Sequence, residues 1–268
     1  MGFQFKQNFS QLIGASVASL LCTGAIVALQ LPQLTKLNNK AKTASVADFQ
    51  KQVESEKLQL QLLRKIPSLG FDRAIADWTF INFLLYFGDD DAREKTGYSL
   101  SPEYFEVIID RDPYFLRSYL FLSSSTTLYA GMPERSVALM NRGLKSLSPQ
   151  IPAKSYYVWR YKAIDELLFL GDAKAAKNSY TKAAEWASTY SDDESKYVAL
   201  FSRQTAAFLA ANPNSKIAQI TSWTSVLGNA FDDRTRRRAI SQIQKLGGIV
   251  TVTPEGKLNV QLSKQVSD

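Results

Sequence analysis

The sequence predicts an all-α protein in which an apolar N-terminal segment precedes a row of helical hairpins and a small C-terminal β-hairpin. Three observations support this fold class. A stretch of 29 uncharged residues ends at Lys36. Turn signals recur about every 40 residues, at Gly131, Gly171 and Asn212, and a repeat on this scale is typical of an α-solenoid. Two short β-type runs occupy about 249–262.

The composition of the 268 residues excludes several kinds of site. The chain has no histidine and one cysteine, which excludes Ser–His–Asp and Cys–His nucleophile systems, HExxH zinc sites, thiolate zinc sites and iron–sulfur clusters. Neither a GxGxxG nor a GxxxxGK[ST] phosphate loop is present. The sequence therefore predicts a protein that is not an enzyme and has no cofactor, metal or small-molecule substrate.

The formal net charge of +7 is unevenly distributed. Residues 1–42 contain four lysines and no acidic residue, whereas the remainder has 28 basic and 25 acidic side chains. A nucleic-acid-binding protein gathers basic side chains on a folded face. Because the body is nearly balanced in charge, the sequence predicts no nucleic-acid partner.

The segment 12–31, LIGASVASLLCTGAIVALQL, is predicted to be a transmembrane helix. Twenty residues at the helical rise span about 30 Å, which is the thickness of the hydrocarbon core of a bilayer. Residues 1–35 thus form a tail and membrane helix, and the polar residues 36–45 form a linker. Three lysines, Lys36, Lys40 and Lys42, follow the segment, and by the positive-inside rule they slightly favour a body on the cytoplasmic side. The opposite orientation remains open, because Lys6 lies on the other side of the segment.

Residues 46–112 are predicted to be a helical entry region that contains an apolar helix at 72–87. Between Ala74 and Phe87 the only charged residue is Asp77. Such a helix is too short to span a bilayer and is expected to be buried on all sides. The alternative is that part of its surface contacts lipid headgroups or a membrane-protein partner. The candidate contact residues are Trp78, Phe80 and Phe83.

Residues 113–230 are predicted to form paired helices. The expected pairs are 114–129 with 133–147, 153–170 with 172–188, and 192–211 with 214–228. A further helix at 232–245 and the β-hairpin complete the C-terminal region 231–268.

One of these pairs resembles a tetratricopeptide repeat. In that family a Gly-Asp turn is followed at fixed spacing by small residues and an aromatic residue, and here Gly171-Asp172, Ala176, Tyr180 and Ala183 follow that spacing. The preceding unit is similar in outline, while the Trp-Leu-Gly pattern of the first helix is missing. The resemblance covers about 113–230 and implies a concave groove lined by the first helix of each unit. Carried over, the partner-binding groove candidates are Ser118, Phe121, Ser125, Tyr161, Asp165 and Leu168.

The segment 69–88 followed by Asp112-Pro113 also resembles uncharacterised membrane-anchored repeat proteins of cyanobacteria. This resemblance implies a bacterial plasma membrane or thylakoid setting and a role near photosynthetic complexes. It brings no reaction with it.

Two charged clusters, one after the apolar helix and one in the helix 232–245, are also candidates for a site. Asp89, Asp90 and Asp91 do not have the spacing of a calcium loop and are predicted to lie in a solvated turn, without metal. Arg236 and Arg237 belong to a basic cluster that is interpreted as a solvated helix face, with contact to anionic lipid as the alternative.

The sequence thus predicts a single-pass membrane scaffold that docks a protein partner, expected to be a membrane complex, during its assembly or stabilisation. The first alternative is a permanent structural subunit of such a complex. The second is an enzyme that uses carboxylates, for which the candidates are Glu103, Glu106, Asp110 and Asp112.

Overall fold

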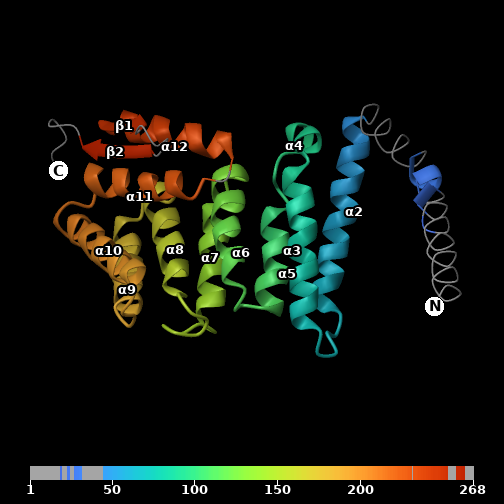
Figure 1. The fold of residues 1–268 in the computed structure, drawn as a ribbon, viewed down its shortest axis with the longest axis horizontal. Helices are drawn as coiled ribbons and strands as arrows, with labels where there is room; N and C mark the ends of the chain where they lie inside the picture. The colour runs from blue at the N-terminus through green and yellow to red at the C-terminus, as the bar shows by residue number, and fades with distance from the viewer. Residues whose placement is uncertain are drawn as a thin grey trace, which may run out of the picture. The chain divides into compact units, whose positions relative to one another are not determined.

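The computed structural model describes residues 19, 23–24, 27–31, 45–230, 232–252 and 258–262. It confirms a mainly helical protein with a two-stranded antiparallel sheet near the C-terminus (Figure 1). The elements are α2 (Val46–Lys65), α3 (Asp72–Gly88), α4 (Asp90–Thr96), α5 (Ser101–Arg111), α6 (Leu116–Leu122), the π-helix η1 (Ser123–Tyr129), α7 (Pro133–Leu144), α8 (Tyr156–Leu168), α9 (Ala173–Ala187), α10 (Asp193–Ala211), α11 (Lys216–Gly228), α12 (Asp233–Lys245), β1 (Gly248–Val252) and β2 (Leu258–Leu262).

Most of the predicted membrane segment 12–31 lies outside the described residues, as does the linker 36–45 apart from Ser45. Among the residues that the structure does describe, no helix has both the length and the apolar character needed to cross a bilayer. The chain divides into two compact units, 1–52 and 53–268, and the second contains every element from α3 onward together with the C-terminal part of α2.

The first core of the second unit is aromatic and centres on Phe83 of α3, which is fully buried. Its ring contacts those of Tyr104 and Phe105 on α5 with centroid distances of 5.8 and 4.6 Å, both in edge-to-face arrangements. Such geometry is favoured by the quadrupoles of aromatic rings. The packing of α3 against α5 therefore fixes the N-terminal half of this unit.

The burial of α3 differs from the expectation. Phe80 and Phe83 lie in the core and are not surface residues, whereas Trp78 is 53% exposed. The side chains of Ile81, Leu84 and Leu85 are also exposed. The helix is apolar all round, but only one of its faces contacts α5, so the prediction of complete burial is wrong.

The predicted 40-residue recurrence is visible in the backbone. Gly131 and Gly171, which follow η1 and α8, have φ angles of +68° and +67°, a conformation that glycine adopts without steric cost. The hydrogen bonds that close the two helices also match at an offset of 40: Ala130 to Ser125 and Leu170 to Asp165, then Met132 to Thr126 and Asp172 to Glu166, in each case from amide to carbonyl. Two consecutive units thus repeat the same local structure.

Another glycine, Gly143, allows close packing within the first of these units. A Cβ at Gly143 of α7 would lie 1.8 Å from the hydroxyl oxygen of Tyr119 on α6. That hydroxyl donates to the carbonyl of Pro113 at 2.8 Å. The missing side chain at residue 143 is therefore what allows the fully buried tyrosine to lie between the two helices.

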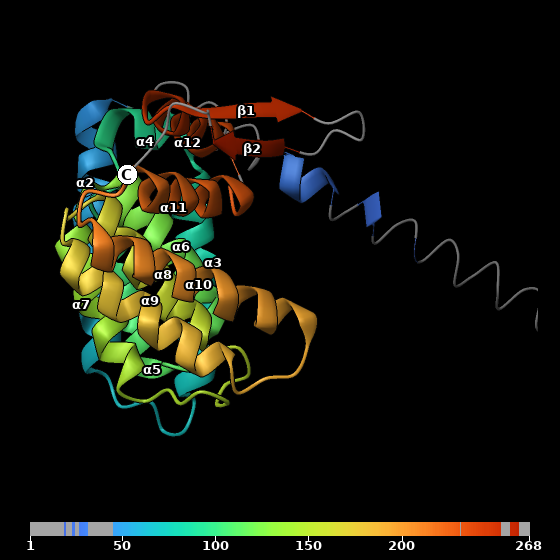
Figure 2. The ribbon, with the colours of Figure 1, turned by 90° about the vertical axis from the view of Figure 1, so that its left-hand side faces the viewer.

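The third predicted pair forms its helices, and α10 and α11 contact each other, but each of them packs mainly on another helix. The helix α10 lies along α9 (Figure 2), whereas α11 crosses over to α8 and packs on α12. The reason is that α11 is apolar on more than one side. Ala218 joins the core of α8 and α9, while Ile220, Trp223 and Leu227 face α12. The two helices α11 and α12 consequently run across the row formed by α6 to α10 (Figure 1).

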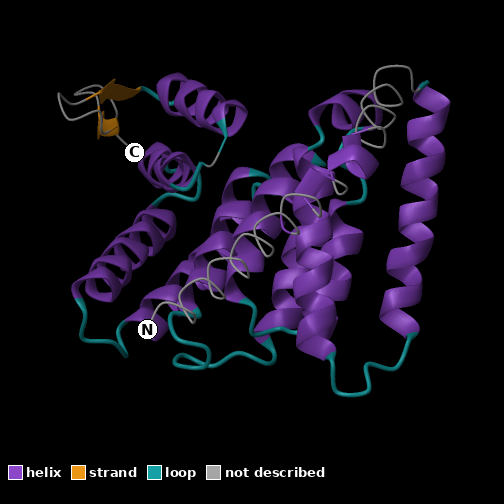
Figure 3. Ribbon diagram, turned by 45° about the vertical axis from the view of Figure 1, so that its right-hand side comes forward, coloured by secondary structure: helices purple, strands orange, loops and turns teal. Residues whose placement is uncertain are grey.

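The C-terminal hairpin packs on the protein itself, as expected. β1 and β2 pair in antiparallel register from Gly248 opposite Leu262 to Val252 opposite Leu258, and the intervening turn lies outside the described residues. Val250 and Val260 contact the core between α11 and α12, and the strands lie beside α12 (Figure 3).

A short helix replaces part of the solvated turn predicted after α3. Asp89 caps α4, since its carboxylate accepts the Ala92 amide at 3.1 Å. Capping of this kind satisfies an amide that the first helical turn leaves free.

Candidate functional site

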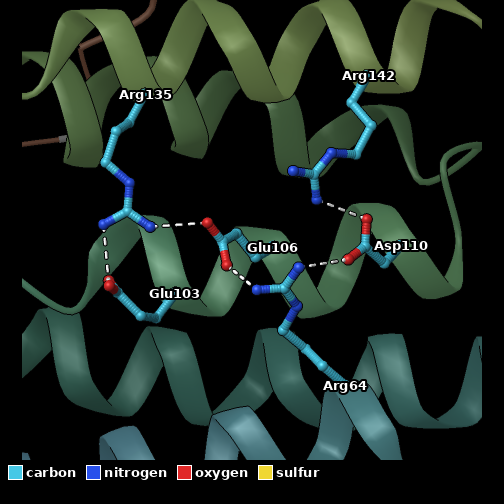
Figure 4. Close-up of polar contacts among 6 residues, drawn as sticks. All are labelled: Arg64, Glu103, Glu106, Asp110, Arg135 and Arg142. Atoms are coloured by element: carbon cyan, nitrogen blue, oxygen red, sulfur yellow. Dashed lines mark hydrogen bonds and ion pairs between the residues drawn. The ribbon is translucent and has the colours of Figure 1, made fainter.

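Three carboxylates on α5 that were candidates for catalysis are engaged by arginines from the neighbouring helices (Figure 4). Arg135 of α7 donates to Glu103 at 2.9 Å and to Glu106 at 2.8 Å. The two carboxylates retain 17% and 18% of their side-chain exposure. The guanidinium therefore bridges successive turns of α5.

The same row continues along α5 to its C-terminal end. Arg64 of α2 pairs with Glu106 and also with Asp110, the latter at 3.2 Å. Asp110 accepts in addition from Arg142 of α7 at 2.8 Å. Asp112 takes no part in the row, because its carboxylate accepts the Tyr114 amide in the turn that follows. The arrangement joins α2, α5 and α7, which supports a structural use of these carboxylates.

Asp165 of α8 is a buried polar centre of a different kind. Its side chain is completely buried, and it accepts hydrogen bonds of 2.7 Å from each of Ser123, Thr127 and Ser136. Burial raises the pKa of Asp165 to about 6, and the three hydroxyl donors oppose that rise. The π-helix supplies two of the donors, Ser123 and Thr127, and α7 supplies the third. Asp165 thus fastens three helices together.

A second buried polar group lies one turn away and joins α8 to α9. Lys162 donates to Glu166 at 2.5 Å and to the Ser179 hydroxyl at 2.9 Å, and that hydroxyl donates to the other oxygen of Glu166 at 2.6 Å. All three side chains are buried. Because each polar group has a partner, the cost of burying the charges is offset locally.

An open groove lies between α8, α10, α11 and β2, and we call it the inner groove. Its walls include Arg160, Tyr197, Phe201, Ser225 and Val260. The rings of Tyr197 and Phe201, one turn apart on α10, have centroids 4.1 Å apart, and Tyr197 is 62% exposed. A small adjoining pocket, which includes Ser123 and Tyr161, shares Ser225 and Asn229 with the groove.

The inner groove carries one positive charge without an acidic partner. Arg160 donates to the Ser225 hydroxyl at 3.0 Å, and its Nε is buried without a hydrogen-bond acceptor. No ion pair connects Arg160 to a carboxylate within the described ranges. A guanidinium in this position can bind an anionic group of a ligand in a bidentate manner.

Few of the residues that the sequence predicted to line a partner-binding groove lie near the inner groove. Ser118, Ser125 and Asp165 are buried in the interior, so their side chains do not line an open surface. Phe121 and Leu168 pack against the hydrophobic cores. Tyr161 lines the small pocket. Asp165 is buried because it faces the hydroxyls of η1 and α7, so the side of α8 on which the groove was expected is used for packing between the helices.

The residues that line the groove were not singled out from the sequence. Tyr197 and Phe201 have the i, i+4 spacing of a surface aromatic pair, and Arg160 directly precedes the candidate Tyr161. These were the available signals. The position of β2 beside α11 had no local signal at all.

The two arginines proposed as surface candidates lie on α12. Arg236 is paired with Asp233 at 2.5 Å, while Arg237 is exposed. Trp78 is exposed on α3, far along the chain from both. The structure thus leaves Trp78 and Arg237 accessible.

Comparison with known protein families, with characterised proteins and with solved structures finds no match to this chain.

Proposed function

We propose that this chain is a single-pass membrane protein whose helical, tetratricopeptide-like body docks a protein partner without catalysing a reaction. The inner groove carries the proposal, because it combines a guanidinium that has no acidic partner among the described residues with the exposed ring of Tyr197 and the half-buried ring of Phe201 on one open surface. Aromatic and arginine side chains are the residues that contribute most to binding at protein interfaces. The client that fits the sequence best is a membrane complex or its assembly intermediate, with photosynthetic complexes as the proposed setting.

The chemistry of the groove favours an extended segment of the partner. The edge of β2 that faces away from β1 has no partner strand within the described part of the chain, and β2 forms one wall of the groove through Val260 and Leu262. A peptide can add to such an edge through main-chain hydrogen bonds. Arg160 would then select an acidic side chain, and Tyr197 an apolar or aromatic one.

The proposed membrane anchor is the apolar segment 12–31. Anchoring restricts the groove to a plane and raises its effective concentration towards membrane-bound partners. The body is proposed to lie on the cytoplasmic side, on the basis of the lysines that follow the segment.

Affinity purification of the full chain from detergent-solubilised membranes tests the docking role. We expect the wild-type chain to enrich one membrane complex, and the variants Tyr197→Ala and Arg160→Gln to lose at least most of it. Tyr114→Ala, which removes an exposed tyrosine outside the groove, serves as the matched control and should retain the complex. Recovery of the chain alone, or equal recovery by all variants, would contradict the proposal.

The exposed face of α3 favours a second candidate function, that of a permanent subunit. Trp78, Ile81 and Leu85 form an apolar stripe at helical spacing, and such stripes are normally covered by a neighbour. A permanent subunit would comigrate with its complex in fixed stoichiometry on a native gel, whereas a transient scaffold would dissociate.

A further inference from the structure

The turn between α2 and α3 presents large apolar side chains to solvent. Leu69 is 83% exposed, which is the highest value for any large apolar residue among those described, and Phe71 is 67% exposed. Ile66, at the start of the turn, is 42% exposed. Two neighbouring apolar side chains at the tip of a connecting turn have no role in the cores of the protein.

The turn is held in place by specific contacts. The Phe71 amide donates to the Ser68 carbonyl at 2.8 Å, and the Ser68 hydroxyl donates to Asp72 at 2.7 Å. Arg111 of α5 donates to the carboxylate of Asp72 at 3.2 Å and to the Ile66 carbonyl at 2.6 Å. The backbone that carries the apolar tip is therefore fastened to α5 on both sides of the turn.

The backbone at the tip is in an unfavourable conformation. Leu69 has a φ of +50°, which few residues other than glycine adopt, because the Cβ approaches the carbonyl oxygen. The side chain that bears this strain makes no contact with the protein core. A strained conformation that directs an apolar side chain outward is most simply explained by an external binding partner.

The charges around the turn are positive. The segments 64–73 and 111–117 contain five basic and two acidic side chains. Both aspartates, Asp72 and Asp112, accept internal hydrogen bonds. Within the described residues Lys65, Arg73 and Arg117 have no acidic partner, and all three are exposed.

The opposite end of α3 is acidic. Asp89, Asp90, Asp91 and Glu94 lie in and before α4, and α3 separates them from the turn by its full length. Arg93 and Lys95 of α4 and the neighbouring Arg234 and Arg237 partly compensate these acidic side chains.

We propose that the α2–α3 turn is a membrane-contact site, at which Leu69 and Phe71 insert into the interface of an anionic lipid bilayer. Lys65 and Arg73 bind the phosphate groups of the lipids beside the insertion. Apolar side chains at headgroup depth together with adjacent cations are the features that attach a surface to anionic lipid. Long cationic side chains around a protruding apolar tip suit a fluid anionic surface, and the open pocket beside the tip is itself lined by Phe71 and Arg73. The site is independent of the inner groove and of the segment 12–31.

The depth of a fluorophore attached at the tip tests this site in the full chain. In a Cys22→Ser background, Leu69→Cys or Phe71→Cys is labelled with an environment-sensitive NBD dye, and the protein is incorporated into phosphatidylcholine vesicles with or without phosphatidylglycerol. We expect a blue-shifted emission that doxyl-labelled lipids quench, at both tip positions, and only when phosphatidylglycerol is present. The same label at Leu200→Cys on α10, which replaces an exposed apolar residue away from the turn, should remain water-like.

Charge reversal separates the sources of such a signal. The variant Lys65→Glu with Arg73→Glu should abolish quenching at the tip, while circular dichroism and thermal unfolding remain as in the parent. Emission that stays water-like at both tip positions in anionic vesicles would overturn the proposal, as would equal quenching at the α10 position. Protection of the tip that requires a protein partner instead of lipid would also overturn it. Retention of the chain in vesicles after carbonate treatment reports on the anchor alone, so the two results can differ.

Discussion

Carboxylates are stabilised in two different ways in the two halves of this body. On α5, Glu103, Glu106 and Asp110 remain partly exposed and are paired with arginines. On α8, Asp165 is fully buried and is surrounded by hydroxyls with no arginine or lysine within ion-pairing distance among the described residues. The comparison indicates that solvent access determines which partners hold a carboxylate, and therefore how much its removal costs.

The physical reason lies in desolvation. A half-exposed ion pair gains little, because water already stabilises both charges. A buried carboxylate gives up its hydration and must recover it from hydrogen bonds inside the protein. Asp165 should therefore be the more critical residue, although it forms no salt bridge.

Removal of the buried carboxylate should give the largest effect. Asp165→Ala leaves the buried hydroxyls of Thr127 and Ser136 without their acceptor and creates a cavity, so we expect a loss of about 3 kcal/mol in the free energy of unfolding. Urea unfolding of the full chain in mild detergent measures it. Asp165→Asn keeps an acceptor and should lose less. A loss below about 1 kcal/mol for the alanine variant would break the comparison.

The pH dependence of stability should show a smaller effect of the same residue. Since burial raises the pKa of Asp165 from 3.8 to about 6, the folded state binds the proton more tightly than the unfolded state. The resulting stabilisation is fully present below about pH 4 and is lost as the pH rises through 6. Relative to Asp165→Asn, the wild type should therefore lose about 2 kcal/mol between pH 4.5 and pH 7.5. A difference that does not change with pH would show that Asp165 keeps one protonation state throughout.

The arginines of the α5 row should give the smallest effects. Arg135→Gln removes a bridge to both Glu103 and Glu106, and we expect a loss of about 1 kcal/mol that decreases at high salt. Arg142→Gln, which breaks one more exposed pair with Asp110, should cost less than about 0.5 kcal/mol. A double-mutant cycle between Arg135 and Glu106 measures the pair directly. A coupling larger than the effect of Asp165→Ala would reverse the comparison.

Much of the fold follows from local signals in the sequence. Gly131 and Gly171 mark the ends of the first helices of two successive units because their backbone conformation favours glycine, and the 40-residue recurrence follows from that preference. The β-hairpin at 249–262 was likewise predicted from local signals, namely two short β-type runs separated by a turn. The path of α11 could not be predicted from local signals, because a helix with apolar residues on several sides can pack in more than one direction. The surfaces that α8 and α12 offer determine the direction that α11 takes.

The candidate site was predicted less well than the fold. The three donors to Asp165 lie 29 to 42 residues away, and serine and threonine occur too widely to reveal such a cluster. On α3, apolar residues lie on every side and Asp77 is the only charged residue between Ala74 and Phe87, so Phe83 and Trp78 could not be assigned to interior and surface. Both failures arise from contacts between elements, which sequence periodicity does not record.

The crosswise placement of α11 and α12 limits how far the row of helices can extend. Ala239 and Ile243 of α12 cover the apolar side of α11, while Arg234 and Arg237 point to solvent. Helical arrays whose terminal surface remains apolar tend to join end to end, and a charged terminal helix prevents this. The charged outer surface of α12 therefore closes this side of the row of helices.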